Sequence, residues 1–171
     1  MGCGFVAAYC AMDLMIIVDS SGSVRDNQVL GVDNWNLTKI FVKEVISRGL
    51  NVGQHYDRVA LIIFSNTAEL RFAFNRYYSL DDILAAVDRL PFIGSVTNTS
   101  LALDLGREVF LDPMYGSRPN ATHIMLLVTD LVEVPSLAWR NRFVDSVSLL
   151  NSTTDVQRFS GFLCFLKLNV V

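Results

Sequence analysis

The stretch that decides the fold is Asp13-Leu14-Met15-Ile16-Ile17-Val18-Asp19-Ser20-Ser21-Gly22-Ser23. Its apolar middle predicts a strand that is buried on both faces, because a short continuous apolar run between polar residues is typical of such strands. Asp19 ends this strand, and a turn rich in hydroxyl groups follows. Open α/β sheets bind their ligands at the carboxyl ends of their strands. Asp19 is therefore expected at a ligand-binding edge.

Ser21 and Ser23 follow Asp19 at spacings of two residues. A tight loop with this spacing can direct the oxygen atoms of all three side chains toward one point. One carboxylate with neutral hydroxyl groups suits a hard divalent cation such as Mg²⁺, which takes oxygen ligands and keeps several of its waters. The same residues leave a second interpretation open, in which Asp19 only caps a Ser/Gly turn.

The composition is that of one folded domain, expected over residues 13–171. The chain has 171 residues, of which 51% are hydrophobic and 18% charged, and this is enough apolar material for a sizeable core. A net charge of −3 and a pI near 5.3, without a basic stripe, argue against a nucleic-acid partner. No apolar run is long enough to span a bilayer.

Residues 1–12 are apolar but carry no basic segment, so we interpret them as an N-terminal flank or the remnant of a signal peptide. The chain has three cysteines, Cys3, Cys10 and Cys164. Three thiols cannot all pair with one another, so one is expected to be free or to pair outside the chain.

Strands and helices are expected to alternate. Apolar runs predict buried strands at 58–64, 123–130 and 162–168. Residues 69–74 alternate polar with apolar after a short turn, which predicts an edge strand antiparallel to its predecessor. Apolar residues spaced by three and four predict helices at 33–49, 79–91, 101–109 and 135–150, and 24–32 is expected to be a loop. The alternation predicts an α/β fold with a doubly wound, mostly parallel sheet, one antiparallel edge strand and helices on both faces.

Two further segments would bring oxygen atoms to the same edge of such a sheet. Thr97 lies in a second hydroxyl-rich loop, and Asp130 ends the strand predicted at 123–130. Together with the first loop, they supply more oxygen atoms than a six-coordinate cation can bind directly when it also keeps waters. Some of these side chains would therefore hold the cation through a bound water. Each has a simpler interpretation when taken alone, Thr97 as a helix cap and Asp130 as a turn residue. The combination favours a metal site.

The chain resembles the von Willebrand factor type A family in three motifs that occur in the family's order: Asp19-Ser20-Ser21-Gly22-Ser23, Thr97-Asn98-Thr99 and Val128-Thr129-Asp130. The likeness runs from about Asp13 to Asp130. It implies a Rossmann-like domain with a metal-ion-dependent adhesion site. The ion that the resemblance implies is Mg²⁺, or else Mn²⁺ or Ca²⁺, and the residues that it places in the site are Asp19, Ser21, Ser23, Thr97 and Asp130.

Within that family, the modules of matrix proteins such as matrilins and type VI collagen look most similar. This resemblance implies a secreted protein of the extracellular matrix. Cys10 is similar to the flanking cysteine with which those modules close the domain by a disulfide. The chain departs from the family pattern at Leu131, where the family usually has glycine, and by a short C-terminal part, which we interpret as truncation or divergence.

Asn-x-Ser/Thr triplets also favour a secreted protein. We expect glycans at Asn36, Asn120 and Asn151, whereas one at Asn98 would obstruct the predicted metal loop.

These features together predict a module without enzymatic activity. The coordination of its cation would be completed by an acidic residue of an extracellular protein, either collagen-like or another matrix protein. The alternative is a structural matrix module with a vestigial metal site. A magnesium-dependent hydrolase is the least favoured, because the chain has no Gly-rich phosphate loop ending in Gly-Lys-Ser/Thr and no second carboxylate close to Asp19 in the sequence.

Overall fold

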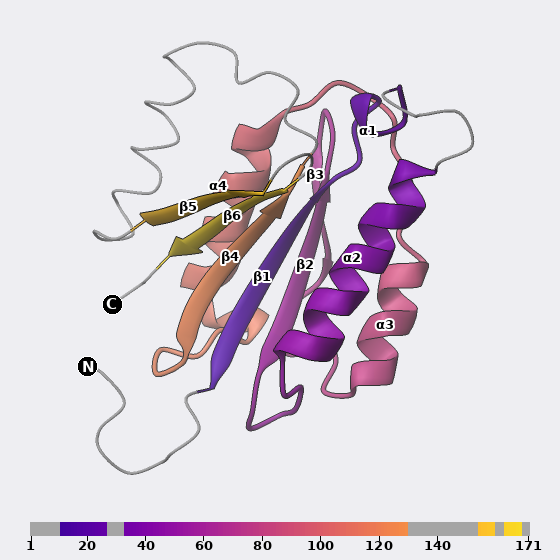
Figure 1. Cartoon of the computed structure of the whole chain (residues 1–171). Coiled ribbons are helices and arrows are strands. Elements are labelled where there is room, and N and C mark those ends of the chain that lie inside the picture. The colour runs from indigo at the N-terminus through magenta and orange to yellow at the C-terminus, as the bar shows by residue number, and fades with distance from the viewer. Residues whose placement is uncertain (1–10, 27–32, 130–153, 160–162, 169–171) are drawn as a thin grey trace.

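In the described part of the chain, six strands form one sheet in the order β3-β2-β1-β4-β6-β5 (Figure 1). The computed structural model describes residues 11–26, 33–129, 154–159 and 163–168. The strands are β1 (Met12–Asp19), β2 (Arg58–Phe64), β3 (Ala68–Phe72), β4 (Thr122–Val128), β5 (Thr154–Phe159) and β6 (Leu163–Leu168). The helices are α1 (Ser23–Asp26), α2 (Asn34–Gly49), α3 (Leu80–Asp88), α4 (Thr99–Leu111) and the short 3-10 helix η1 (Pro113–Tyr115).

The centre of the sheet is parallel, as predicted. β1 pairs in parallel with both β2 and β4, and β3 is the predicted edge strand, antiparallel to β2. β6 pairs antiparallel with β4, and β5 pairs antiparallel with β6. The predicted α/β class and the antiparallel edge strand are therefore confirmed, and β5 is an addition that the sequence pattern did not predict.

Two local predictions have other outcomes. Residues 23–26 form α1, although the segment from 24 onward was predicted to be a loop. The predicted helix at 135–150 lies outside the described residues.

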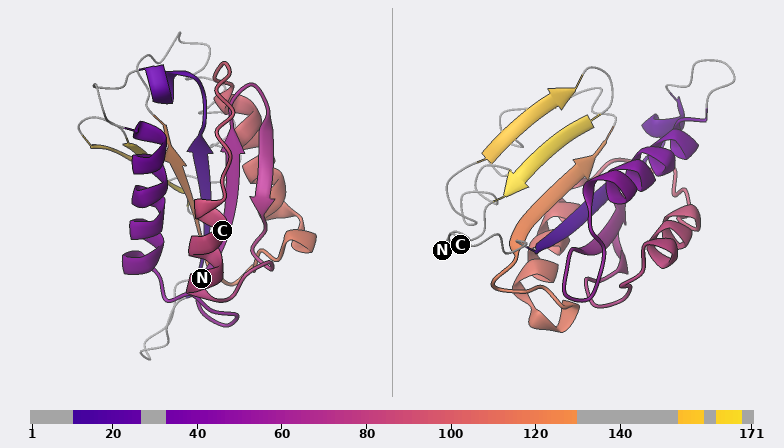
Figure 2. Two further views of the ribbon diagram at one scale, coloured as in Figure 1. Left: turned by 90° about the vertical axis from the view of Figure 1, so that its right-hand side faces the viewer. Right: turned by 60° about the horizontal axis from the view of Figure 1, so that its bottom comes forward.

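The central strands are buried on both faces because helices cover both sides of the sheet (Figure 2). Successive side chains of a strand point to opposite faces. In β1, Leu14, Ile16 and Val18 pack in one apolar cluster with residues of α2 and α3. Met15 and Ile17 pack in the other, with residues of α4. This double burial explains why the sequence of β1 is a continuous apolar run up to Asp19, the last residue of the strand.

Helix α2 begins where the sequence predicts. The carboxylate of Asp33 accepts a hydrogen bond of 3.2 Å from the backbone N–H of Asn36, as an N-cap residue does. The buried face of α2 carries Trp35, Val42 and Ile46. Within the described part of the chain, no helix has the length and apolarity that crossing a membrane requires.

Gly116 offers a test of the packing at the end of the sheet away from Asp19. Its φ is +80°, and an added Cβ would lie 2.6 Å from Cβ and 2.9 Å from the backbone nitrogen of Asn75. We expect Gly116→Ala to lower the free energy of unfolding by about 1–3 kcal/mol, because both the left-handed backbone and the contact with Asn75 oppose a side chain. Urea denaturation would measure this loss.

The matched control is Gly49→Ala, because an added Cβ at Gly49 meets no atom within 4 Å. That variant should unfold at close to the wild-type urea concentration. Equal midpoints for the two variants would contradict the structural role of Gly116.

Candidate functional site

The carboxylate of Asp19 is held in place by its own loop. Asp19 is the last residue of β1 and is only 1% exposed. Its Oδ1 accepts a hydrogen bond of 2.8 Å from the backbone N–H of Ser21. This bond closes the turn after β1 and sets the direction of the carboxylate at the carboxyl edge of the sheet.

Thr129 holds the other oxygen of the same carboxylate. Its hydroxyl group donates a hydrogen bond of 2.7 Å to Oδ2 of Asp19. The parallel register of β1 and β4 pairs Val18 with Val128, so the residues that follow these two lie side by side. No role was predicted for Thr129 from the sequence. The signal that could have found it is a hydroxyl residue at the same strand-end position as Asp19.

Ser21 and Ser23 meet in the loop after β1. Their Oγ atoms lie 3.1 Å apart, within hydrogen-bond distance. Ser21 is buried and Ser23 is half-buried. The structure therefore brings together the carboxylate of Asp19 and two hydroxyl groups in one turn, as the spacing of two residues predicts.

The loop that carries Thr97 is bonded to this turn through the backbone. The N–H of Gly94 donates to the carbonyl of Ser20, and the N–H of Gly22 donates to the carbonyl of Ser95, each at 2.8 Å. Thr97 itself is exposed, two residues beyond Ser95. The second predicted loop thus lies against the first at the same edge.

Ser65, which follows β2, fastens this second loop to the sheet. Its hydroxyl group donates to the carbonyl of Val96 and accepts from the N–H of Ser95, both at 3.1 Å. Its carbonyl accepts from the N–H of Asn98 at 2.8 Å. Ser65 is fully buried. It positions the Thr97 segment, a role that the sequence analysis also missed.

The oxygen atoms at this edge are of the kind that Mg²⁺ prefers, a carboxylate with hydroxyl groups. Among the described residues, no three His, Cys, Asp or Glu side chains cluster in an arrangement that could hold a metal ion. A cation at this edge would therefore depend on the hydroxyl groups of Ser21 and Ser23 as much as on Asp19. Asp130, the remaining predicted ligand, directly follows Thr129 and lies outside the described residues.

The predicted glycosylation and cysteine positions are placed only in part. Asn36, in the first turn of α2, and Asn120, in the turn before β4, are exposed. Asn98 is half-buried, and its Oδ1 accepts a hydrogen bond of 2.8 Å from the Ser100 hydroxyl group. Asn151 and Cys10 lie outside the described residues.

Comparison with known proteins finds relatives among matrix proteins. The collagen alpha-6(VI) chain of Mus musculus is 32% identical over 157 residues, which are 87% of this chain and 7% of the collagen. Matrilin-3 of Gallus gallus is 32% identical over 123 residues, 70% of this chain and 25% of the matrilin. The chain thus spans a small part of the length of these relatives.

A solved structure has the same fold. Proximal thread matrix protein 1 from the mussel byssus, described with a zinc-occupied MIDAS motif, matches with a TM-score of 0.68 at 20% identity, over 82% of this chain and 36% of that one. Residues 13–140 match the family described as the von Willebrand factor type A domain. The chain belongs to the von Willebrand factor type A domain family.

Proposed function

We propose that this chain is a protein-binding module, for adhesion or matrix assembly, that depends on a divalent cation. The observation that carries the proposal is the turn in which Asp19, Ser21 and Ser23 meet at the carboxyl edge of the sheet. Thr97, in the adjoining loop, and Asp130, directly after Thr129, would complete the set of ligands. Mg²⁺ is the expected ion, with Mn²⁺ or Ca²⁺ as alternatives.

The side chains would have different roles in binding the cation. Both oxygens of Asp19 already accept hydrogen bonds from the protein, from Ser21 and Thr129, so this carboxylate is suited to holding a metal-bound water. The hydroxyl oxygens of Ser21 and Ser23 would be direct ligands. The cation would supply one open coordination position, which a carboxylate of the partner fills. The partner would be an extracellular matrix protein, collagen-like or other, because the relatives are collagen VI and matrilin chains.

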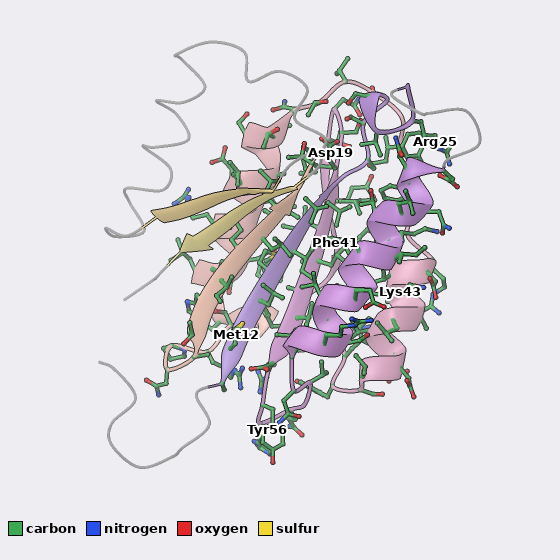
Figure 3. All side chains as sticks on the ribbon, in the orientation of Figure 1. Met12, Asp19, Arg25, Phe41, Lys43 and Tyr56 are labelled. Carbon is green, nitrogen blue, oxygen red and sulfur yellow. The ribbon has the colours of Figure 1, made fainter. Side chains whose placement is uncertain are left out.

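Hydrolysis is disfavoured by the position of the histidines. His123 pairs in register with Asp13, at the start of β1, whereas Asp19 is at its end. His55 lies in the connection before β2 next to Tyr56, at the same far end of the sheet (Figure 3). Neither imidazole can therefore act as a general base on a ligand bound at Asp19.

A binding assay tests the proposal directly. The chain, immobilised on beads, should retain protein from an extracellular-matrix extract in Mg²⁺ and release it in EDTA. A double variant, Ser21→Ala with Ser23→Ala, should retain none, because it lacks two metal ligands but keeps both hydrogen bonds of Asp19. Retention that is equal in Mg²⁺ and EDTA would contradict the proposal and favour a structural module with a vestigial metal site.

A further inference from the structure

Arg25 lies close to the candidate site in the sequence and is stacked on an aromatic ring. It belongs to α1, which starts at Ser23, and its guanidinium carbon lies 3.9 Å from the centroid of the Phe92 ring. The side chain is exposed. Stacking occupies one face of the guanidinium plane and leaves the N–H groups at its edge free to bind a carboxylate with two hydrogen bonds.

The ring beneath Arg25 is itself held in place. The rings of Phe92 and Trp35 have centroids 5.6 Å apart, and Trp35 is a buried residue of α2. Gly94 has a φ of +73°, and an added Cβ there would lie 2.9 Å from the Phe92 ring, so only glycine lets the loop approach it this closely. We call Trp35, Phe92 and Arg25 the stacked shelf.

The stacked shelf is connected to the metal-binding turn. The N–H of Gly94, two residues after Phe92, donates to the carbonyl of Ser20 in that turn. Arg25 follows Ser23 by two residues, and the N–H of Arg25 donates to the carbonyl of Gly22 at 3.0 Å. Arg25 and Asp19 accordingly lie at the same end of the molecule (Figure 3). A ligand bound at the turn and extending toward α1 would meet the guanidinium in a position set by the Phe92 ring.

The charge of Arg25 is left available by its surroundings. Among the described residues, Arg25 forms no ion pair. Two acidic side chains of the described residues have partners of their own, since Asp33 caps α2 and Glu69 pairs with Arg71. An exposed cation that is already ordered loses little conformational entropy on binding, so an ion pair formed there contributes more to affinity.

We propose that Arg25 is a second anchor for the partner. Its guanidinium binds a second carboxylate of the same partner protein, in addition to the carboxylate that fills the open coordination position of the metal ion. This inference rests on the proposed function, and it specifies the partner as a protein segment with two acidic residues at a fixed separation.

Selection of random short peptides displayed on phage tests this inference. In Mg²⁺, wild-type protein should select peptides that EDTA releases and that share two acidic positions. Arg25→Glu should select peptides that keep one acidic position and have lost the other or replaced it with Lys or Arg. A synthetic two-acid peptide should bind Arg25→Ala about tenfold more weakly than wild type. Arg25→Lys should fall between them, because lysine keeps the charge but not the paired hydrogen bonds.

The control is Arg48→Glu, which makes the same change of charge on an 81% exposed side chain in the last turn of α2. It should bind the peptide as wild type does. The melting temperature of Arg25→Glu should still rise with Mg²⁺, which shows that the variant folds and binds metal.

Four results would contradict the inference. Peptides that EDTA releases but that have a single acidic position, or an unchanged affinity in Arg25→Ala, would overturn the role of Arg25 alone. If Arg25→Glu loses binding to heparin and the selected peptides share no second acidic position, the guanidinium of Arg25 binds a sulfated glycan instead. Failure to select any peptide that EDTA releases would overturn the proposed function and the second anchor together.

Discussion

Replacing Arg118 with alanine is expected to lower the free energy of unfolding by about 3 kcal/mol, because it leaves a buried carboxylate without its counter-ion. Asp13, at the start of β1, is 0% exposed. The guanidinium of Arg118 donates to Oδ1 of Asp13 through Nη2 at 2.5 Å and through Nε at 2.9 Å. The backbone N–H of residue 118 also donates to Oδ2, at 2.7 Å. This last bond survives the substitution, so the loss should lie at the low end of the range for broken buried pairs.

Urea denaturation is the suitable measurement. The imidazole of His123 also lies near this carboxylate, with its Nε2 3.8 Å from Oδ2 of Asp13, and it remains in the variant. The control is Arg48→Ala, which removes an exposed ion pair with Glu44 and should cost well under about 1 kcal/mol. Removing both partners, as in Arg118→Ala with Asp13→Asn, should recover part of the loss, because no charge is then left buried. If the two arginine variants unfold at the same urea concentration, the pair does not stabilise the sheet as argued.

The sequence predicts the central sheet well because burial on both faces leaves a simple pattern. The predicted strand at 58–64 has the bounds of β2, and the predicted helix at 33–49 coincides with α2 and its cap. β5 was missed because its short run, Thr154–Phe159, alternates polar and apolar residues weakly, and its pairing with β6 is not visible in local sequence. α1 was missed because it is a single turn, too short for any periodicity.

The candidate site was predictable where its residues are close in sequence. The contact between Ser21 and Ser23 and the bond from Ser21 to Asp19 follow from a local spacing of two residues. Thr129 and Ser65 could not be found in this way. Their roles depend on the register of β1 with β4 and on where the loop after α3 crosses the end of β2. The place of Asp130 as a ligand stays a prediction.

Replacing Asp19 with alanine is expected to abolish the stabilisation of the chain by Mg²⁺. A ligand that binds only the folded state stabilises it, by about 2.7 kcal/mol when its concentration is 100-fold above its dissociation constant. The melting temperature of the wild-type chain should therefore rise in millimolar Mg²⁺ relative to EDTA. Without the carboxylate of Asp19, the turn lacks its one described negative charge, and the melting temperature should be the same in both buffers.

The difference between the two buffers is the informative quantity, because Asp19→Ala has a second effect. It removes the acceptor of the Ser21 N–H and of the Thr129 hydroxyl group, both buried, and this should cost about 1–3 kcal/mol even without metal. The double variant Ser21→Ala with Ser23→Ala keeps these bonds, so it should lose the response to Mg²⁺ at little cost to metal-free stability.

Asp104→Ala removes the same charge from an exposed position of α4 and should respond to Mg²⁺ as wild type does. A response that persists in Asp19→Ala would place the ion elsewhere in the chain, and a wild type that does not respond would favour a structural module over a metal-dependent one.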